Sequence, residues 1–120
     1  MAKRKAKRPA TRRKARRGAP AKLPKNAVTL AVILRAKEGQ EPLLEAELRA
    51  LIAPTRREDG CLTYDLHRAL EIPGAFLLHE VWATREHHRL HTKTPHFLRW
   101  DARKDALLAG RDATFWQQLA

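Results

Sequence analysis

The residues best suited to chemistry gather in one segment, residues 79–97, with the sequence HEVWATREHHRLHTKTPHF. The segment holds five of the six histidines of the chain, together with Glu80 and Trp82. Histidine exchanges a proton near neutral pH and is also a common metal ligand. Three interpretations follow: a metal site, an acid–base pocket around an organic substrate, or ordinary solvated histidines.

The metal interpretation depends on helical spacing. His87 and His91 lie four residues apart, and His88 and His91 three apart, so either pair would share one helix face. Glu80 could add a third ligand. Zinc sites use three or four ligands, usually with help from cysteine or carboxylate, and the sequence has no H-E-x-x-H or C-x-x-C motif. We therefore predict no metal at this segment.

The acid–base interpretation depends on Glu80, which the strand pattern places between apolar neighbours on one face. A buried carboxylate needs a hydrogen-bond partner or acquires a raised pKa. His91 or His96, from the helices that follow, could be that partner. Together with Trp82, these side chains could line a pocket between sheet and helices. The alternative is a structural Glu80 with a single hydrogen bond and a partly exposed His96.

The elements that must position these residues follow from hydrophobic periodicity. Leu44, Leu48 and Leu51 have helical spacing, whereas residues 61–69 and 75–83 alternate as strands do. Thr84 and Thr94 can each cap a helix, and Gly110 is the expected stop of the last one. The predicted strands are 26–36, 61–69, 75–83 and 112–120, and the predicted helices are 41–57, 85–92 and 95–109.

This order is β-α-β-β-α-β, the ferredoxin-like arrangement of the α+β class. One antiparallel sheet would carry helices on one face, and its other face would be open to water in a monomer. A partly apolar open face usually needs a partner, so we expect a homodimer. The chain of 120 residues, 43% of them hydrophobic, suffices for one such domain over residues 26–120.

The net charge of +12 is confined to the N-terminal segment, residues 1–25, which holds twelve Lys/Arg and no acid, so the rest is neutral. Such a composition predicts a disordered tail. The tail could contact nucleic-acid phosphates without reading sequence, because it has no aromatic residue and no groove-binding helix. The residues for such contacts are Lys3, Arg4, Lys5, Lys7, Arg8, Arg12, Arg13, Lys14, Arg16 and Arg17.

Cysteine content and hydropathy bear on location. Cys61 is the single cysteine, so no intrachain disulfide forms, and we interpret it as a small buried thiol rather than a nucleophile. The longest nearly continuous apolar run, AVTLAVIL, is far too short to span a bilayer. The N-terminus lacks the apolar region of a secretory signal. We therefore expect a cytoplasmic protein with no membrane partner.

Residues 27–119 resemble the antibiotic biosynthesis monooxygenase family. The resemblance rests on the first strand and helix, on the run P-T-R-x-E-x-G-C-L-x-Y, and on the segments EVWA and LHTKTPHF. It implies a dimer of α+β domains with a pocket between sheet and helices. It further implies oxidation of a phenol, anthrone or dihydroquinone by dioxygen, with no cofactor.

The resemblance also suggests site residues. His91 would be the base, with Glu80 as its orienting partner, and the aromatic residues would form the pocket walls. The expected catalytic residues are His91, Glu80 and His96, and the expected substrate-binding residues are Trp82, Tyr64 and Phe97.

Other functions on the same fold stay open. Haem-degrading relatives use an asparagine on the first strand, where this chain has the apolar run LAVIL, so haem degradation is not expected. A small-metabolite isomerase would need more polar walls than Trp82 and Phe97 provide. A dimeric binding protein with a nucleic-acid-binding tail is the remaining alternative.

Overall fold

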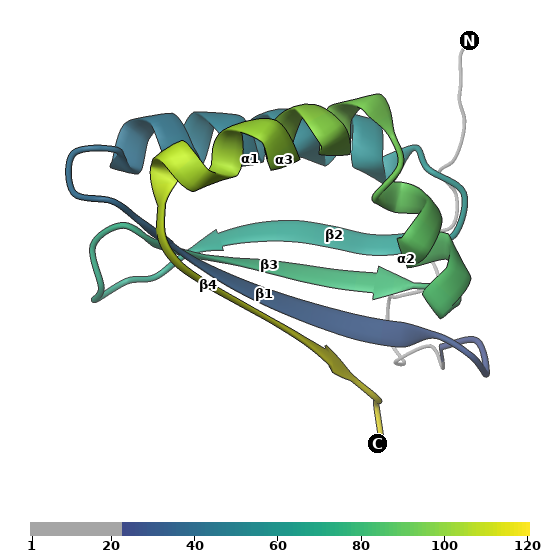
Figure 1. Ribbon diagram of the computed structural model, residues 1–120. Helices are drawn as coiled ribbons and strands as arrows, with labels where there is room; N and C mark the ends of the chain where they lie inside the picture. The colour runs from purple at the N-terminus through teal and green to yellow at the C-terminus, as the bar shows by residue number, and fades with distance from the viewer. Residues whose placement is uncertain (1–22) are drawn as a thin grey trace, which may run out of the picture.

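The computed structural model describes residues 23–120 (Figure 1). The predicted basic tail, residues 1–25, therefore lies outside the described residues except for its last three. The elements follow in the order β1 (Val28–Ala36), α1 (Glu41–Arg56), β2 (Cys61–Arg68), β3 (Ala75–Trp82), α2 (Arg85–His91), α3 (Pro95–Leu107) and β4 (Leu108–Trp116).

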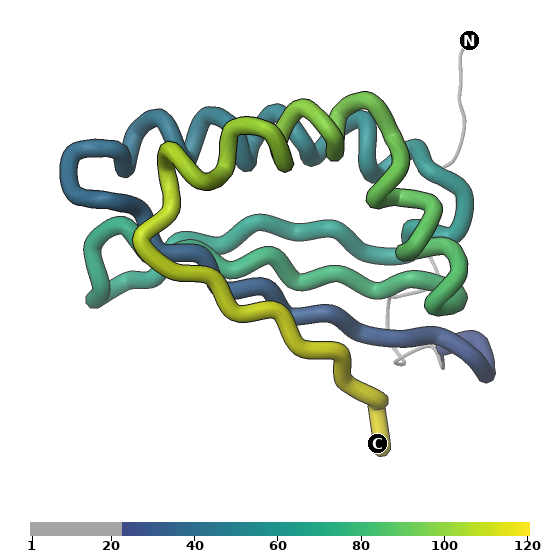
Figure 2. The backbone as a smooth tube through the Cα atoms, in the orientation of Figure 1, coloured from purple at the N-terminus to yellow at the C-terminus, as the bar shows by residue number. Residues whose placement is uncertain are grey.

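The four strands form one antiparallel sheet in the order β2-β3-β1-β4. All helices lie on one face of this sheet, with α1 and α3 side by side above it, as Figures 1 and 2 show. This confirms the predicted ferredoxin-like α+β fold. No helix within residues 23–120 has the length and apolar character needed to cross a membrane.

The helix starts follow the local sequence signals. The Thr84 hydroxyl accepts the backbone N–H of His87 at the start of α2, and the Thr94 hydroxyl accepts that of Phe97 at the start of α3. These side chains satisfy amide groups that a helix leaves unpaired at its first turn. Both caps fix where the histidine-bearing helices begin.

The junction between α3 and β4 differs from the prediction. The helix ends at Leu107 and the strand begins at Leu108, four residues earlier than expected, so Gly110 lies inside the strand opposite Arg35. A Cβ atom at Gly110 would stand 2.1 Å from the Arg35 guanidinium. The glycine therefore leaves room for the Arg35 side chain across the strand pair and does not stop a helix. Pairing with β1 outweighs the helical preference of the Leu-Leu-Ala sequence.

Strand β2 also departs from simple alternation. The register with β3 shifts between Cys61 and Thr63, and the resulting irregularity leaves Leu62 45% exposed. Tyr64 is 2% exposed and faces the core. The alternation predicted over residues 61–69 would put Leu62 and Tyr64 on one face, and this is wrong, because a bulge reverses the facing of the residues before it. Cys61 is partly buried, and burial raises the pKa of its thiol to about 12.

The core lies between the sheet and the helices. Alternate residues of β1, namely Leu30, Val32 and Leu34, pack there with the buried leucine stripe of α1. On the opposite sheet face, Ile33 and Trp116 are largely exposed. The sheet therefore has one covered face and one open face, as the sequence pattern indicated.

Candidate functional site

A carboxylate and two histidines meet where the segment before β2 approaches the junction of α2 and α3. One oxygen of Glu58 lies 2.8 Å from His91 Nδ1 and 2.5 Å from His96 Nε2. His91 is 1% exposed, whereas the side chains of Glu58 and His96 are 13% and 17% exposed. We call these three residues the Glu58 cluster.

Close packing of the neighbouring loop brings Glu58 to this position. Gly60 has a φ of +80°, and a Cβ atom there would stand 2.2 Å from the His87 ring. The His87 ring is itself tied to the Thr84 hydroxyl at 2.8 Å. Glycine is the residue that best tolerates both the left-handed backbone and this close approach. The loop therefore lies directly against α2, with Glu58 beside His91.

The hydrogen bonds fix which nitrogen of His91 is free. An ionised carboxylate only accepts hydrogen bonds, so His91 Nδ1 carries the hydrogen and donates it to Glu58. Nε2 of the neutral ring then keeps its lone pair. Burial lowers the pKa of His91, and the Glu58 carboxylate partly opposes this effect. The ring is therefore neutral, and able to accept a proton, at pH values where an ordinary histidine is partly charged.

Aromatic rings surround His91. Its ring centroid lies 4.8 Å from that of Trp82, 5.0 Å from that of Phe97 and 5.6 Å from that of Tyr64. Contacts of this kind hold a buried ring in one orientation. His91 is thus held on one side by hydrogen bonding and on the others by packing.

Glu80 has a different partner from the one expected. Its carboxylate accepts the indole N–H of Trp82 at 2.9 Å, and the carboxylate that orients His91 is Glu58. The expected pairing of Glu80 with His91 is therefore wrong: Glu80 and Trp82, two residues apart on β3, satisfy each other. Burial raises the pKa of Glu80 to about 7, although the Trp82 hydrogen bond and the charge of Arg111 act in the opposite direction.

Sequence reasoning missed Glu58, although its signal was present. Glu58 stands in the run P-T-R-x-E-x-G-C-L-x-Y, two residues before Gly60, the glycine that directly precedes β2. An acid followed by a turn glycine places a carboxylate at the end of a sheet. Its partners, however, lie 33 and 38 residues away along the chain, and spacing alone does not bring them together.

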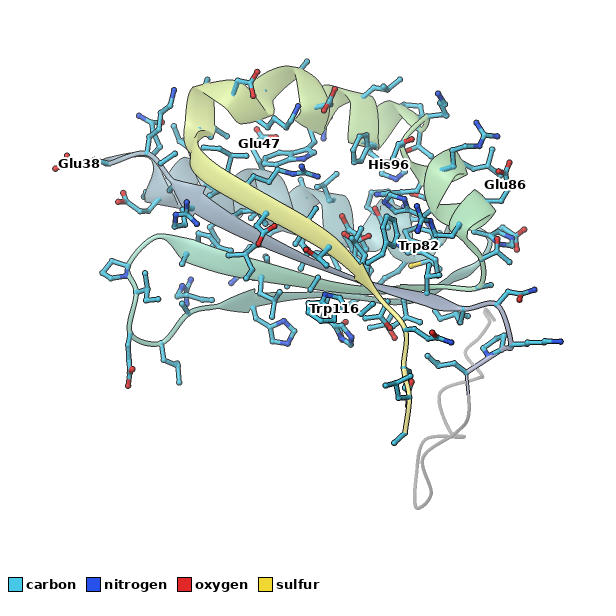
Figure 3. All side chains as sticks on the ribbon, turned by 60° about the horizontal axis from the view of Figure 1, so that its bottom comes forward. Glu38, Glu47, Trp82, Glu86, His96 and Trp116 are labelled. Atoms are coloured by element: carbon cyan, nitrogen blue, oxygen red, sulfur yellow. The ribbon has the colours of Figure 1, made fainter. Side chains whose placement is uncertain are left out.

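A cavity of about 190 Å³ lies between the sheet and α3 beside this cluster. Four of the six predicted site residues line it: Tyr64, Glu80, His91 and Phe97. Trp82 is fully buried against His91, and His96 reaches the site through Glu58; neither is among the lining residues. Figure 3 shows Trp82 and His96 in the same part of the molecule, near the α2–α3 junction.

The Glu58 cluster also has the composition of a two-histidine, one-carboxylate metal site. Its ligand atoms lie within 4.8 Å of one another. The ligands considered from helical spacing, His87, His88 and Glu80, form no such group with His91 within residues 23–120. The hydrogen bonds already described account for the observed arrangement without an ion.

Comparison with known proteins agrees with this architecture. Residues 27–103 match the family model described as Antibiotic biosynthesis monooxygenase. The chain is 40% identical over 65 residues to a Mycobacterium tuberculosis protein named "Putative monooxygenase Rv0793", a match that covers 54% of this chain and 63% of that protein.

Solved structures extend the likeness over nearly all of the described domain. PA3566 from Pseudomonas aeruginosa is 38% identical, with a TM-score of 0.77 over 79% of this chain and 96% of its own. The structure of Rv0793 gives a TM-score of 0.75 at 30% identity, over 79% of this chain and 97% of its own. The chain therefore belongs to the antibiotic biosynthesis monooxygenase family.

Proposed function

We propose that the protein is a cofactor-independent monooxygenase that oxidises an electron-rich aromatic substrate, such as a dihydroquinone, a phenol or an anthrone. The observation that carries this proposal is a buried His91, oriented by Glu58, on the wall of a largely apolar cavity. Such a histidine can remove a proton from a bound substrate. Family membership supports a monooxygenase-type reaction.

The chemistry balances without an external reductant. Removal of a proton from a dihydroquinone or anthrone gives an anion rich enough in electrons to reduce dioxygen directly. One oxygen atom then joins the substrate carbon and the other leaves as water, so that an anthrone CH₂ group becomes a carbonyl. The substrate supplies all four electrons that reduce dioxygen, and the protein has to bind the ring, take the proton and exclude water.

Each residue of the site has a role in this scheme. His91 accepts the proton at Nε2, and Glu58 stabilises the imidazolium that results. His96 shares the same Glu58 oxygen and fixes that carboxylate in place. Tyr64 and Phe97 form the walls against which an aromatic ring packs.

Glu80 and Trp82 complete the proposed site. A carboxyl with a pKa of about 7 is protonated in part near neutrality, so Glu80 can donate a hydrogen bond to a substrate oxygen. Trp82 supports both groups, because it donates to Glu80 and packs against His91.

We further propose that the protein is a homodimer that associates through the open face of the sheet. This face carries the exposed side chains of Ile33 and Trp116. Apolar side chains exposed on an uncovered sheet face are typical of an interaction surface. Sedimentation of the purified protein tests this part of the proposal, and a monomer at micromolar concentration would contradict it.

Oxygen uptake with a dihydroquinone tests the enzymatic proposal. The protein is stripped of metal, and autoxidation without protein is subtracted. We expect uptake above autoxidation, reduced about 10²–10⁴-fold in His91→Gln, because the general base is lost. His67→Gln is the matched control, since His67 is an exposed histidine on β2. Equal loss in both variants, or none in His91→Gln, would contradict the role of His91.

A further inference from the structure

Arg111 places a positive charge on the cavity wall opposite the Glu58 cluster. In the register of β4 with β1, Arg111 pairs with Leu34, Ala113 with Val32 and Phe115 with Leu30. Alternate strand residues point to one face, and these three residues of β4 all line the cavity. Arg111 therefore belongs to the helix-covered face of the sheet, although β4 is an edge strand.

Arg111 makes no ion pair or side-chain hydrogen bond with any residue of the described part of the chain. Several other arginines do have acidic partners, among them Arg56 with Asp65 and Arg89 with Glu86. The one acid on the cavity wall, Glu80, is hydrogen-bonded to Trp82 instead. The guanidinium thus keeps its donors available to a molecule in the cavity.

The rest of the cavity makes this charge effective. The groups on the wall include Leu34, Phe97 and Phe115. Two histidines also line it, and burial keeps both neutral: it lowers the pKa of His88 to about 4 and lowers that of His91. Arg111 is itself exposed, so it can meet an anion at the mouth of the cavity while the apolar wall takes the rest of the ligand. Its planar donors fit a carboxylate with two parallel hydrogen bonds.

We infer that Arg111 anchors the carboxylate of an aromatic acid and so selects hydroxylated aromatic carboxylates as substrates. Selection of substrates rests on the proposed function, whereas the anion-binding site rests only on the placement of Arg111. An aromatic acid bound in this way would lie between two fixed points. Its carboxylate would meet Arg111, and its ring would extend along Phe97 and Tyr64 toward His91.

Binding of a ligand that cannot be oxidised tests the anion site separately from turnover. Calorimetry compares naphthoate with naphthamide, a neutral molecule of nearly the same shape. We expect naphthoate to bind at least about tenfold more tightly than naphthamide, because charged hydrogen bonds are lost in the amide. In Arg111→Gln the preference disappears, and in Arg111→Lys a smaller preference remains.

Arg35→Gln is the matched control. It removes the same charge from β1, on the face of the sheet opposite the cavity, and should keep the naphthoate preference. An equal preference in wild type and Arg111→Gln overturns the inference. So does an equal loss in Arg35→Gln, which would show a general effect of net charge. Absence of naphthoate binding at millimolar concentration overturns it as well.

Oxygen uptake distinguishes the two proposals. Dihydroquinones with and without a carboxyl group are compared in wild type and Arg111→Gln. Carboxylate-selective binding without any uptake supports the anion site and counts against the oxygenase. Uptake that is equal for both substrates and unchanged in Arg111→Gln supports the oxygenase and overturns the role of Arg111.

Discussion

Glu58 and Glu80 are two carboxylates of one site in opposite situations. Glu58, in the loop between α1 and β2, is partly open to water and has two histidine donors from α2 and α3. Glu80, on the inner face of β3, is 3% exposed and has one indole donor. Burial raises the pKa of Glu80 to about 7, although the indole hydrogen bond acts in the opposite direction. The comparison shows that the two carboxylates are held differently: Glu58 by two histidines from distant helices, and Glu80 by an indole two residues along its own strand.

The sharpest test of this difference is Glu58→Gln. The amide keeps the shape but cannot stabilise the imidazolium of His91, so we expect kcat to fall about 10²–10⁴-fold. The substitution also removes the interaction that raises the pKa of His91. The pKa should fall further, and the acidic limb of the pH–rate profile should move to lower pH.

If Glu58 had only a structural role, its replacement would not shift the acidic limb of the pH–rate profile. The measurement is kcat/KM against pH for wild type and Glu58→Gln. For wild type the activity should be retained below the ordinary histidine value of 6.5, because His91 must be neutral to accept a proton. A limb that stays in place, or that moves to higher pH, would contradict the proposed partnership.

Glu80→Gln should stabilise the fold, and more so at higher pH. Because the folded state raises the pKa of Glu80 from 4.5 to about 7, ionisation of this group destabilises the fold as pH rises. Glutamine still accepts the Trp82 hydrogen bond and never ionises. The free energy of unfolding of the variant, relative to that of wild type, should therefore increase by roughly 2–3 kcal/mol as the pH rises from 5 to 8.

Urea unfolding at the two pH values measures this gain. Glu45→Gln is the control, because Glu45 is an α1 carboxylate outside the cavity whose pKa is lowered by its hydrogen bonds to Arg68 and Arg49. A gain for Glu80→Gln that is the same at both pH values would show that ionisation of Glu80 is not its cause.

Gly60→Ala tests whether loop packing positions Glu58. The added methyl group would overlap the His87 ring, and the backbone at φ +80° disfavours alanine. We expect a loss of about 2 kcal/mol in stability, together with lower activity. In Gly60→Ala/His87→Ala the overlap is removed, so the double variant should be more stable than the sum of the single effects predicts. Strict additivity, measured by urea unfolding, would show that the ring contact is unimportant.

Removal of metal should have the smallest effect. If the Glu58 cluster works through hydrogen bonds, extensive chelation followed by gel filtration should leave oxygen uptake unchanged. Loss of activity that one divalent ion restores would instead show that the cluster is a metal centre. The difference between Glu58 and Glu80 would then arise from metal binding by Glu58.

Local signals in the sequence predicted much of the fold. Thr84 and Thr94 cap the helices as expected, and alternation correctly placed Glu80 and Trp82 on the inner face of β3. These features depend on neighbours along the chain. The first residue of β4 depends on pairing with β1, and the exposure of Leu62 depends on a bulge, so neither followed from periodicity.

The candidate site was predictable only in part for the same reason. Strand alternation brought Glu80 into the cavity wall, and the helix pattern put His91 close to it. The contact between Glu58 and His91 instead depends on how the loop at Gly60 packs against α2. A close approach between segments far apart in sequence has no local signature, whereas burial on a strand does.

The placement of Arg111 and Ala113 on an edge strand has a consequence for evolution. Both residues are exposed, line the cavity and lie outside the Glu58 cluster. Exchanges at exposed positions usually alter stability very little. Substitutions at these two positions would therefore change the cavity wall at little cost in stability and leave the Glu58 cluster in place. One scaffold would then supply a repertoire of related activities through drift and selection at a few tolerant positions.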